Sequence, residues 1–244
     1  MMNSSFSWNS FCASVIGPGH ISTATPNQDS WLAFHQGWGD GIAVADGVGS
    51  KSHADFGSSA ACQAVKMTVR NFADSFSREQ ILNFPSAVLS CWTELVVPLD
   101  PRDCSSTCLY AFRSGDGLLR IGMIGDGCAA AVKIDGRVLV LSVNKDDGFT
   151  NITIALNSNV NEKSWKTLDV RESECRAIVL CTDGVSDDLE NVEGFILGFV
   201  EAHRNLARLS ASRRTREMLE NWPAPKQSDD KTIVCLMRVD EVDE

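Results

Sequence analysis

Short runs of apolar, β-branched residues recur along most of this chain, and turn residues separate them. This alternation is typical of antiparallel sheet proteins. The predicted strands lie at residues 42–45, 109–112, 118–124, 129–134, 138–143, 177–181 and 233–239.

Two longer segments break this pattern with helical spacing. Between residues 54 and 76, apolar side chains recur every three to five positions, which predicts an amphipathic helix. A second helix is predicted over residues 86–97, where Pro98 and Pro101 stop it. Two more helices are predicted between residues 192 and 222, before a final strand. This order predicts an α+β protein with two stacked antiparallel sheets and paired helices outside them.

Composition narrows the class of protein. The chain has 244 residues, of which 43% are hydrophobic and 22% charged, which excludes a collagenous or wholly disordered chain. It shows no internal repeat or Pro/Ser-rich linker, so we expect one domain over residues 1–244. No apolar run approaches the roughly 20 residues that a membrane span needs. Residues 1–20 contain no Lys or Arg, and no signal peptide is predicted.

Charge and cysteine content point to an acidic protein of a reducing compartment. Thirty-two acidic and 22 basic residues give a formal charge of −10, which disfavours nucleic acid as a partner. The nine cysteines form no CxxC pair, so we expect free structural thiols and a cytoplasmic location. One basic stretch leaves two interpretations open, a site for an acidic partner or nucleic acid and a solvated helix face. It comprises Arg204, Arg208, Arg213, Arg214 and Arg216.

The Asp-Gly dipeptide occurs seven times and has two meanings here. Asp116-Gly117 and Asp135-Gly136 each lie between two predicted strands, so we interpret both as hairpin turns. Asp46, Asp126 and Asp183 instead follow nearly continuous apolar runs, which are typical of strands buried on both faces.

Buried strands that end in carboxylates require a compensating charge. An unpaired buried charge costs several kcal/mol, and several acids together repel one another. Asp29 lies just ahead of another short segment, residues 30–34, and the Asp229-Asp230 pair lies just before the last predicted strand. The histidines are scattered, so the ligands are carboxylates, which favours Mg²⁺ or Mn²⁺ over Zn²⁺. Two such ions about 3.5–4 Å apart can activate a water and hold a phosphoryl oxygen.

Five segments, taken in order, carry a resemblance to a known family. They are residues 27–30, 45–50, 124–127, 181–187 and 229–232. Together they resemble the metal-dependent protein phosphatases (type 2C serine/threonine phosphatases) in their bacterial form, over residues 15–236. The resemblance implies a four-layer αββα sandwich, two Mn²⁺ or Mg²⁺ ions with a third in many bacterial members, and a phosphoprotein substrate. We also expect a serine/threonine kinase as functional partner, a monomer, and no membrane partner.

The resemblance also implies roles for individual residues. Asp46 would bridge both ions, with Gly47 offering its backbone carbonyl, and Asp183 and Asp229 would complete one ion's ligands. Asp29 would orient water, and Asp126 and Asp187 would hold the third ion. Hydrolysis would proceed without a covalent intermediate, by in-line attack of a water or hydroxide that bridges the two ions. Lys231 and Thr232 complete the last motif with no catalytic role.

Three positions depart from the family pattern. Gln28 stands where many members carry an acid, Val48 where eukaryotic members carry a His, and Ala24 where an Arg grips the substrate phosphate. We hypothesise that His20 or Lys51, which lie near these motifs in sequence, grips the phosphate instead. The alternative is a catalytically weak or inactive phosphatase-like module that binds or senses a ligand.

Two further questions stay open at the level of sequence. Either Asp229 or Asp230 can be the metal ligand. Residues 146–165 fall where family members vary a flap over the cleft.

Overall fold

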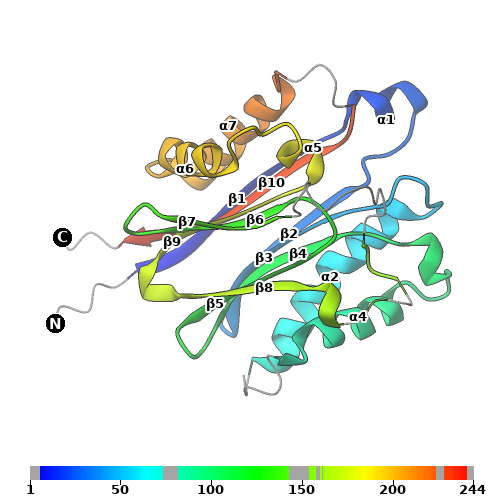
Figure 1. The fold of residues 1–244 in the computed structure, drawn as a ribbon, viewed down its shortest axis with the longest axis horizontal. Helices are drawn as coiled ribbons and strands as arrows, with labels where there is room; N and C mark the ends of the chain where they lie inside the picture. Colours follow the sequence, from blue (N-terminus) through cyan, green and yellow to red (C-terminus); the bar gives the residue numbers. More distant parts are fainter. Residues whose placement is uncertain are drawn as a thin grey trace.

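Two five-stranded antiparallel sheets lie face to face, with helices covering the outer face of each (Figure 1). The computed structural model describes residues 6–73, 82–142, 154–157, 160, 162–223 and 228–240. The first sheet has the order β1-β10-β9-β6-β7 and the second β2-β3-β4-β5-β8. The predicted α+β sandwich of four layers is therefore confirmed.

The strands of each sheet come from distant parts of the chain. The first sheet contains β1 (Phe6–Val15), β10 (Lys231–Asp240), β9 (Cys175–Cys181), β6 (Cys128–Lys133) and β7 (Val138–Ser142). The second contains β2 (Asp29–Gln36), β3 (Gly39–Asp46), β4 (Cys108–Ser114), β5 (Leu118–Ile124) and β8 (Lys166–Arg171).

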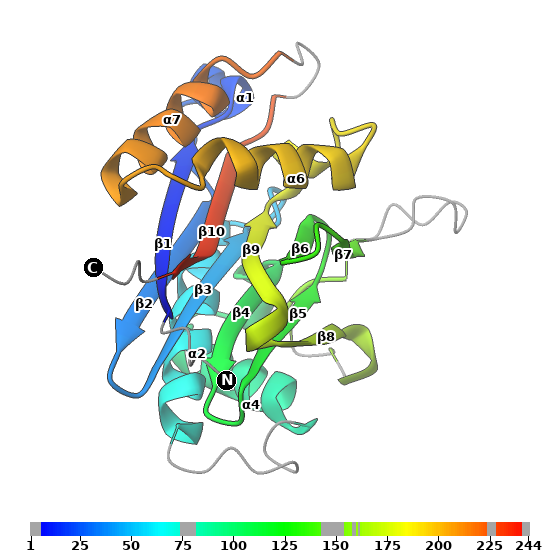
Figure 2. The ribbon, with the colours of Figure 1, turned by 90° about the vertical axis from the view of Figure 1, so that its left-hand side faces the viewer.

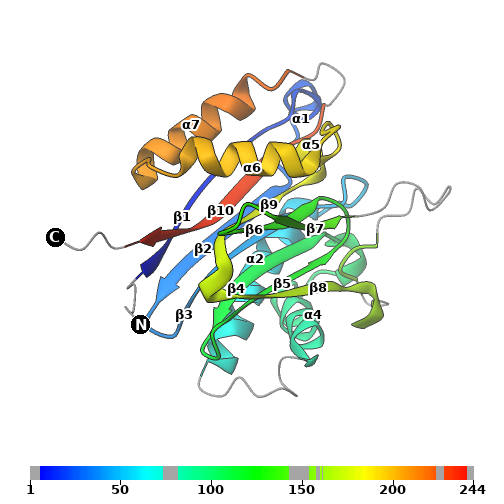
Figure 3. The same ribbon diagram turned by 60° about the vertical axis from the view of Figure 1, so that its left-hand side comes forward.

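Helices cover the two outer faces and also occupy one end of the sandwich. Over the first sheet lie α6 (Val192–His203) and α7 (Arg208–Glu220), with α7 against β1 (Figure 2). Under the second sheet lie α2 (Ala54–Phe72) and α4 (Phe84–Leu95) (Figure 3). The short helices α1 (Pro18–Thr23) and α5 (Asp183–Ser186) lie at one end of the sandwich (Figure 1). None of the described helices is both long and apolar enough to span a membrane.

Three apolar layers hold these elements together. One packs α2 and α4 against the second sheet, a second packs α6 and α7 against the first, and a third fills the space between the sheets. Because β3 has helices on one face and the other sheet on the opposite face, its residues Ile42, Ala43, Val44 and Ala45 are all fully buried. This explains the continuous apolar run that precedes Asp46.

Both predicted hairpin turns are confirmed. Asp116-Gly117 joins β4 to β5, and Asp135-Gly136 joins β6 to β7. Gly117 and Gly136 have φ values of +78° and +87°, in the left-handed region that glycine tolerates best.

Several element boundaries differ from the sequence prediction. The apolar pattern does not predict strands β1 and β8, because polar side chains interrupt their apolar positions. The helix predicted to reach residue 76 ends at Phe72, and residues 74–81 lie outside the described part. The next helix, α4, begins earlier than predicted because Pro85 occupies its first turn, where proline is favoured. Most of residues 146–165, where family members vary a flap, also lies outside the described residues.

Candidate metal centre

Three carboxylates from separate parts of the chain meet at the end of the sandwich that carries α5. Asp46 ends β3, Asp126 lies between β5 and β6, and Asp183 follows β9 as the first residue of α5. One oxygen from each lies within 4.8 Å of the others. Thr107 fixes the backbone of Asp46, since its hydroxyl accepts the Asp46 N–H at 2.8 Å and its own N–H donates to the Asp46 carbonyl at 2.7 Å. The strand ends therefore converge, as expected of carboxylates that need a shared counter-charge.

The electrostatics around Asp183 favour a cation. Its Oδ1 atom is buried and has no hydrogen-bond partner in the described structure. Burial, followed by the charges of Asp126, Asp229 and Asp187, raises the pKa of Asp183 to about 7. A buried carboxylate oxygen without a donor is the kind of atom that a divalent ion satisfies.

Asp46 experiences the same kind of environment. Burial raises its pKa well above the ordinary value, and four neighbouring acids, Asp29, Asp183, Asp229 and Asp126, act in the same direction. Within the described residues, no Lys or Arg forms an ion pair with Asp46. The protein therefore supplies repulsion at this carboxylate rather than neutralisation.

Asp29 lies directly opposite Asp46 in the pairing of β2 with β3. Its Oδ2 atom accepts a hydrogen bond of 2.8 Å from the Thr182 hydroxyl. Burial raises the pKa of Asp29 to about 7, although the neighbouring Thr232 and Thr182 side chains act to lower it. Asp29 thus belongs to the same group of acids as Asp46 and Asp183.

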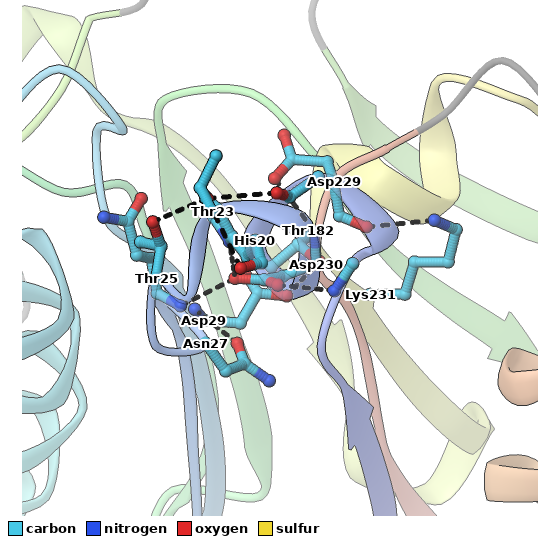
Figure 4. Close-up of polar contacts among 12 residues, drawn as sticks. His20, Thr23, Thr25, Asn27, Asp29, Thr182, Asp229, Asp230 and Lys231 are labelled. Atoms are coloured by element: carbon cyan, nitrogen blue, oxygen red, sulfur yellow. Dashed lines mark hydrogen bonds and ion pairs between the residues drawn. The ribbon is translucent and has the colours of Figure 1, made fainter.

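The two neighbouring acids Asp229 and Asp230 have different environments (Figure 4). Asp230 is buried, and its carboxylate accepts the backbone N–H groups of Gly17 at 2.7 Å and Gln28 at 2.6 Å. The same carboxylate contacts His20 Nδ1 at 2.8 Å. Asp229 is half-buried, and its charge raises the pKa of both Asp46 and Asp183. Because the protein already engages both oxygens of Asp230, Asp229 is the better candidate ligand.

Two glycines of the Asp-Gly pairs allow the backbone to pack closely at this site. A Cβ atom on Gly47 would lie 2.3 Å from the carbonyl oxygen of Ala54, at the start of α2. A Cβ on Gly184 would lie 2.0 Å from the carbonyl oxygen of Asp230. Any side chain at either position would push apart the segments that carry the acids.

The remaining predicted residues lie in different surroundings. His20 belongs to the site through Asp230, and one atom each of His20, Asp229 and Asp230 lies within 4.8 Å of the others. Lys51 is half-buried in the turn after β3, and no described contact joins its side chain to the carboxylates. Asp187 is exposed at the end of α5. Ala24 ends α1 in the left-handed region, with φ of +54°.

Sequence reasoning missed the residues that hold the acids in place. Thr107 and Thr182 contact Asp46 and Asp29 directly, yet they lie 61 and 153 positions away in the chain. Thr182 carries one available signal, because it directly precedes Asp183 at the end of a buried strand. Thr107 carries none.

Comparison with known proteins identifies the same family as the sequence motifs. Residues 16–222 match the family model described as protein phosphatase 2C. No curated protein matches this chain in sequence.

Solved structures of low sequence identity share the fold. The catalytic domain of the serine/threonine protein phosphatase PstP, solved with two manganese ions, is 20% identical, with a TM-score of 0.62 over 97% of this chain and 100% of that one. The photosystem II phosphatase PBCP is 15% identical, with a TM-score of 0.65 over 95% of this chain and 98% of that one. RsbX, solved with magnesium, is 14% identical, with a TM-score of 0.60 over 96% and 99% of the two chains.

Proposed function

Because this chain belongs to the protein phosphatase 2C family, we propose that it is a metal-dependent phosphatase that hydrolyses phosphoserine and phosphothreonine in proteins. One observation carries the proposal: Asp46, Asp126 and Asp183 converge within 4.8 Å, and Asp183 Oδ1 is buried without a partner. Clustered buried carboxylates lower the stability of the fold unless cations neutralise them. Their presence here therefore fits a function that uses bound cations.

The donor set fits two Mn²⁺ or Mg²⁺ ions. Asp46 and the Gly47 carbonyl would serve both ions, and Asp183 and Asp229 would complete the ligands of one of them. Asp126 and Asp187 would hold a third ion. Carboxylate and carbonyl oxygens are the donors that these hard cations prefer. The two manganese ions of PstP and the magnesium of RsbX, in proteins of the same fold, support this choice.

The proposed reaction transfers a phosphoryl group to water and releases the seryl or threonyl hydroxyl. Two divalent ions would supply an acidified water and neutralise negative charge on the phosphoryl oxygens. The chain's own contribution is positioning. Asp29, with Oδ2 held by Thr182, would orient the attacking water, and Asp46 would keep the cations close together.

The phosphate contact is proposed for His20 rather than Lys51. Asp230 holds the imidazole at the rim of the acidic group, whereas no described contact brings Lys51 there. The test compares His20→Ala and Lys51→Ala on a phosphopeptide. We expect a raised KM for His20→Ala alone, and an unchanged KM for both would refute a phosphate contact at either residue.

The second candidate function is a binding or sensor module without turnover. Ala24, at the position where the resemblance expects a phosphate-gripping Arg, favours it. Manganese-dependent hydrolysis of para-nitrophenyl phosphate by the wild type, absent in Asp46→Asn and Asp183→Asn, would support the enzyme. Manganese binding without hydrolysis of this compound or a phosphopeptide would support the module.

We also propose a cytoplasmic setting, a monomer and a serine/threonine kinase that phosphorylates the substrate. All nine cysteines are free, which is compatible with a reducing compartment.

A further inference from the structure

A closed ring of hydrogen bonds surrounds Asp29 (Figure 4 shows part of it). The Thr182 hydroxyl donates to Asp29 Oδ2 at 2.8 Å and accepts the Thr232 N–H at 3.1 Å. The Thr232 hydroxyl donates to Ser14 Oγ at 2.8 Å. Asn27 Nδ2 donates to the same Ser14 oxygen at 3.0 Å, and Asn27 Oδ1 accepts the Asp29 N–H at 2.8 Å, which closes the ring.

The ring connects the two sheets at the candidate metal centre. Asp29 begins β2 of the second sheet, whereas Ser14 and Thr232 belong to β1 and β10 of the first. Thr182 follows β9 and directly precedes Asp183. The hydrogen bond from Thr182 to Asp29 therefore links Asp29, at the start of β2 in the second sheet, to the segment that carries Asp183, at the end of β9 in the first sheet.

Burial makes this contact difficult to replace with water. Thr182 and Thr232 are 1% and 0% exposed. Removing the Thr182 hydroxyl would leave Asp29 Oδ2 without its donor, and a buried acceptor that loses its partner is costly. The carboxylate would then be free to rotate away from its present orientation.

We propose that Thr182 and Thr232 are positioning residues for Asp29. The Thr182 hydroxyl orients the Asp29 carboxylate, the Thr232 hydroxyl holds the Asp29 N–H through Ser14 and Asn27, and together they set the affinity of the site for divalent cations. This inference rests on the proposed function, because it concerns the same metal centre. Residues that orient the groups around a metal typically change its affinity by about 10- to 100-fold when mutated.

The experiment measures Mn²⁺ affinity by titration calorimetry and Tm in EDTA for matched variants. Thr182→Val keeps the shape of the side chain and removes the hydroxyl, whereas Thr182→Ser keeps the hydroxyl. Thr232→Val removes the second hydroxyl of the ring. Thr215→Val is the control, because Thr215 is also fully buried but donates to the Ala211 carbonyl within α7, on the outer layer.

We expect Thr182→Val to bind Mn²⁺ about 10-fold more weakly or worse, and Thr232→Val to weaken binding in the same direction. Thr182→Ser should stay within about threefold of the wild type, and Thr215→Val should lower Tm without changing affinity. If Thr182→Val does not fold, Thr232→Val and Thr182→Ala provide the same comparison.

Three results would overturn the inference. These are a wild-type affinity in Thr182→Val, an affinity in Thr182→Ser as weak as in Thr182→Val, or an equal loss in Thr215→Val. In each case the wild type still binds Mn²⁺, so the proposed function survives. A wild type that binds no Mn²⁺ would overturn the proposed function and this inference together.

Discussion

The two ends of strand β3 carry the same dipeptide in opposite electrostatic surroundings. Near the start of the strand, Asp40 contacts His35 Nδ1 at 2.8 Å and Arg113 Nη1 at 3.1 Å. Burial acts to raise the pKa of Asp40, but the hydrogen bonds and charges of His35 and Arg113 outweigh it and lower the pKa. At the end of the strand, burial and four acids raise the pKa of Asp46 instead.

The network around Asp40 continues between the two sheets. Arg113 Nε lies 3.0 Å from Glu172, which also accepts a hydrogen bond of 2.8 Å from the Trp8 indole. His35 Nε2 contacts the Ser10 hydroxyl at 2.8 Å. At this end the chain neutralises its own acids and gains a structural link. At the other end, the charges around Asp46 are those of four acids, and Asp183 Oδ1 has no hydrogen-bond partner among the described residues, which distinguishes the candidate metal centre from the Asp40 cluster.

The largest predicted effect is the loss of phosphatase activity in Asp46→Asn or Asp183→Asn. Removing one carboxylate charge from the metal centre should lower kcat/KM by at least about 100-fold. Asp40→Asn, which changes the same residue type at the other end of β3, should retain most of the activity. Steady-state kinetics with a phosphopeptide and Mn²⁺ measure all three, and an equal loss in Asp40→Asn would remove the distinction between the two ends.

Stabilisation by Mn²⁺ is the next largest effect. An ion at about 100 times its dissociation constant stabilises the fold by about 2.7 kcal/mol, which corresponds to a rise in Tm of roughly 5–10 °C for a chain of this size. Thermal unfolding with Mn²⁺ or EDTA tests it. The rise should persist in Asp40→Asn and be largely lost in Asp183→Asn, and its persistence in Asp183→Asn would contradict the assigned ligand.

The stability of the metal-free protein should decrease as the pH rises toward neutrality. Asp29 and Asp183 have pKa values of about 7 in the folded chain, against about 3.9 when unfolded. Between these values the folded state binds more protons, so the free energy of unfolding decreases as pH rises from about 4 to 7.

In EDTA, Tm should therefore be lower at pH 8 than at pH 5.5. Asp183→Asn should raise Tm at pH 8, because the amide mimics the uncharged acid, while it removes activity. Asp40 has the opposite effect on stability. Because its pKa is lowered in the folded chain, its stabilising contribution is present at neutral pH and is lost only as the pH falls into the acid range. A Tm that rises steadily from pH 5.5 to 8 in EDTA would contradict the repulsion among these acids.

The smallest predicted effect concerns Arg113. Its side chain is 45% exposed, so solvent weakens its ion pairs with Asp40 and Glu172. Arg113→Gln should cost about 1 kcal/mol and lower Tm by roughly 2–4 °C, with kcat/KM unchanged. Thermal unfolding and kinetics test both parts, and a large loss of activity would show that the two ends of β3 are coupled.

Residues of the candidate site can be predicted from the sequence where a local pattern marks them. Asp46 and Asp183 can be located because each follows an apolar run and precedes a glycine. The ring around Asp29 cannot be predicted, because it depends on how β1, β10 and β2 lie beside one another. Likewise, the choice between Asp229 and Asp230 depends on backbone N–H groups of Gly17 and Gln28, more than 200 positions away.

The most direct test of the central claim is anomalous diffraction at the manganese edge from crystals grown with Mn²⁺. We predict two strong peaks beside Asp46, one of them also in contact with Asp183 and Asp229. Crystals that contain Mn²⁺ in the solvent but show no peak among these carboxylates would contradict the claim that the acidic end of the sandwich is a metal centre.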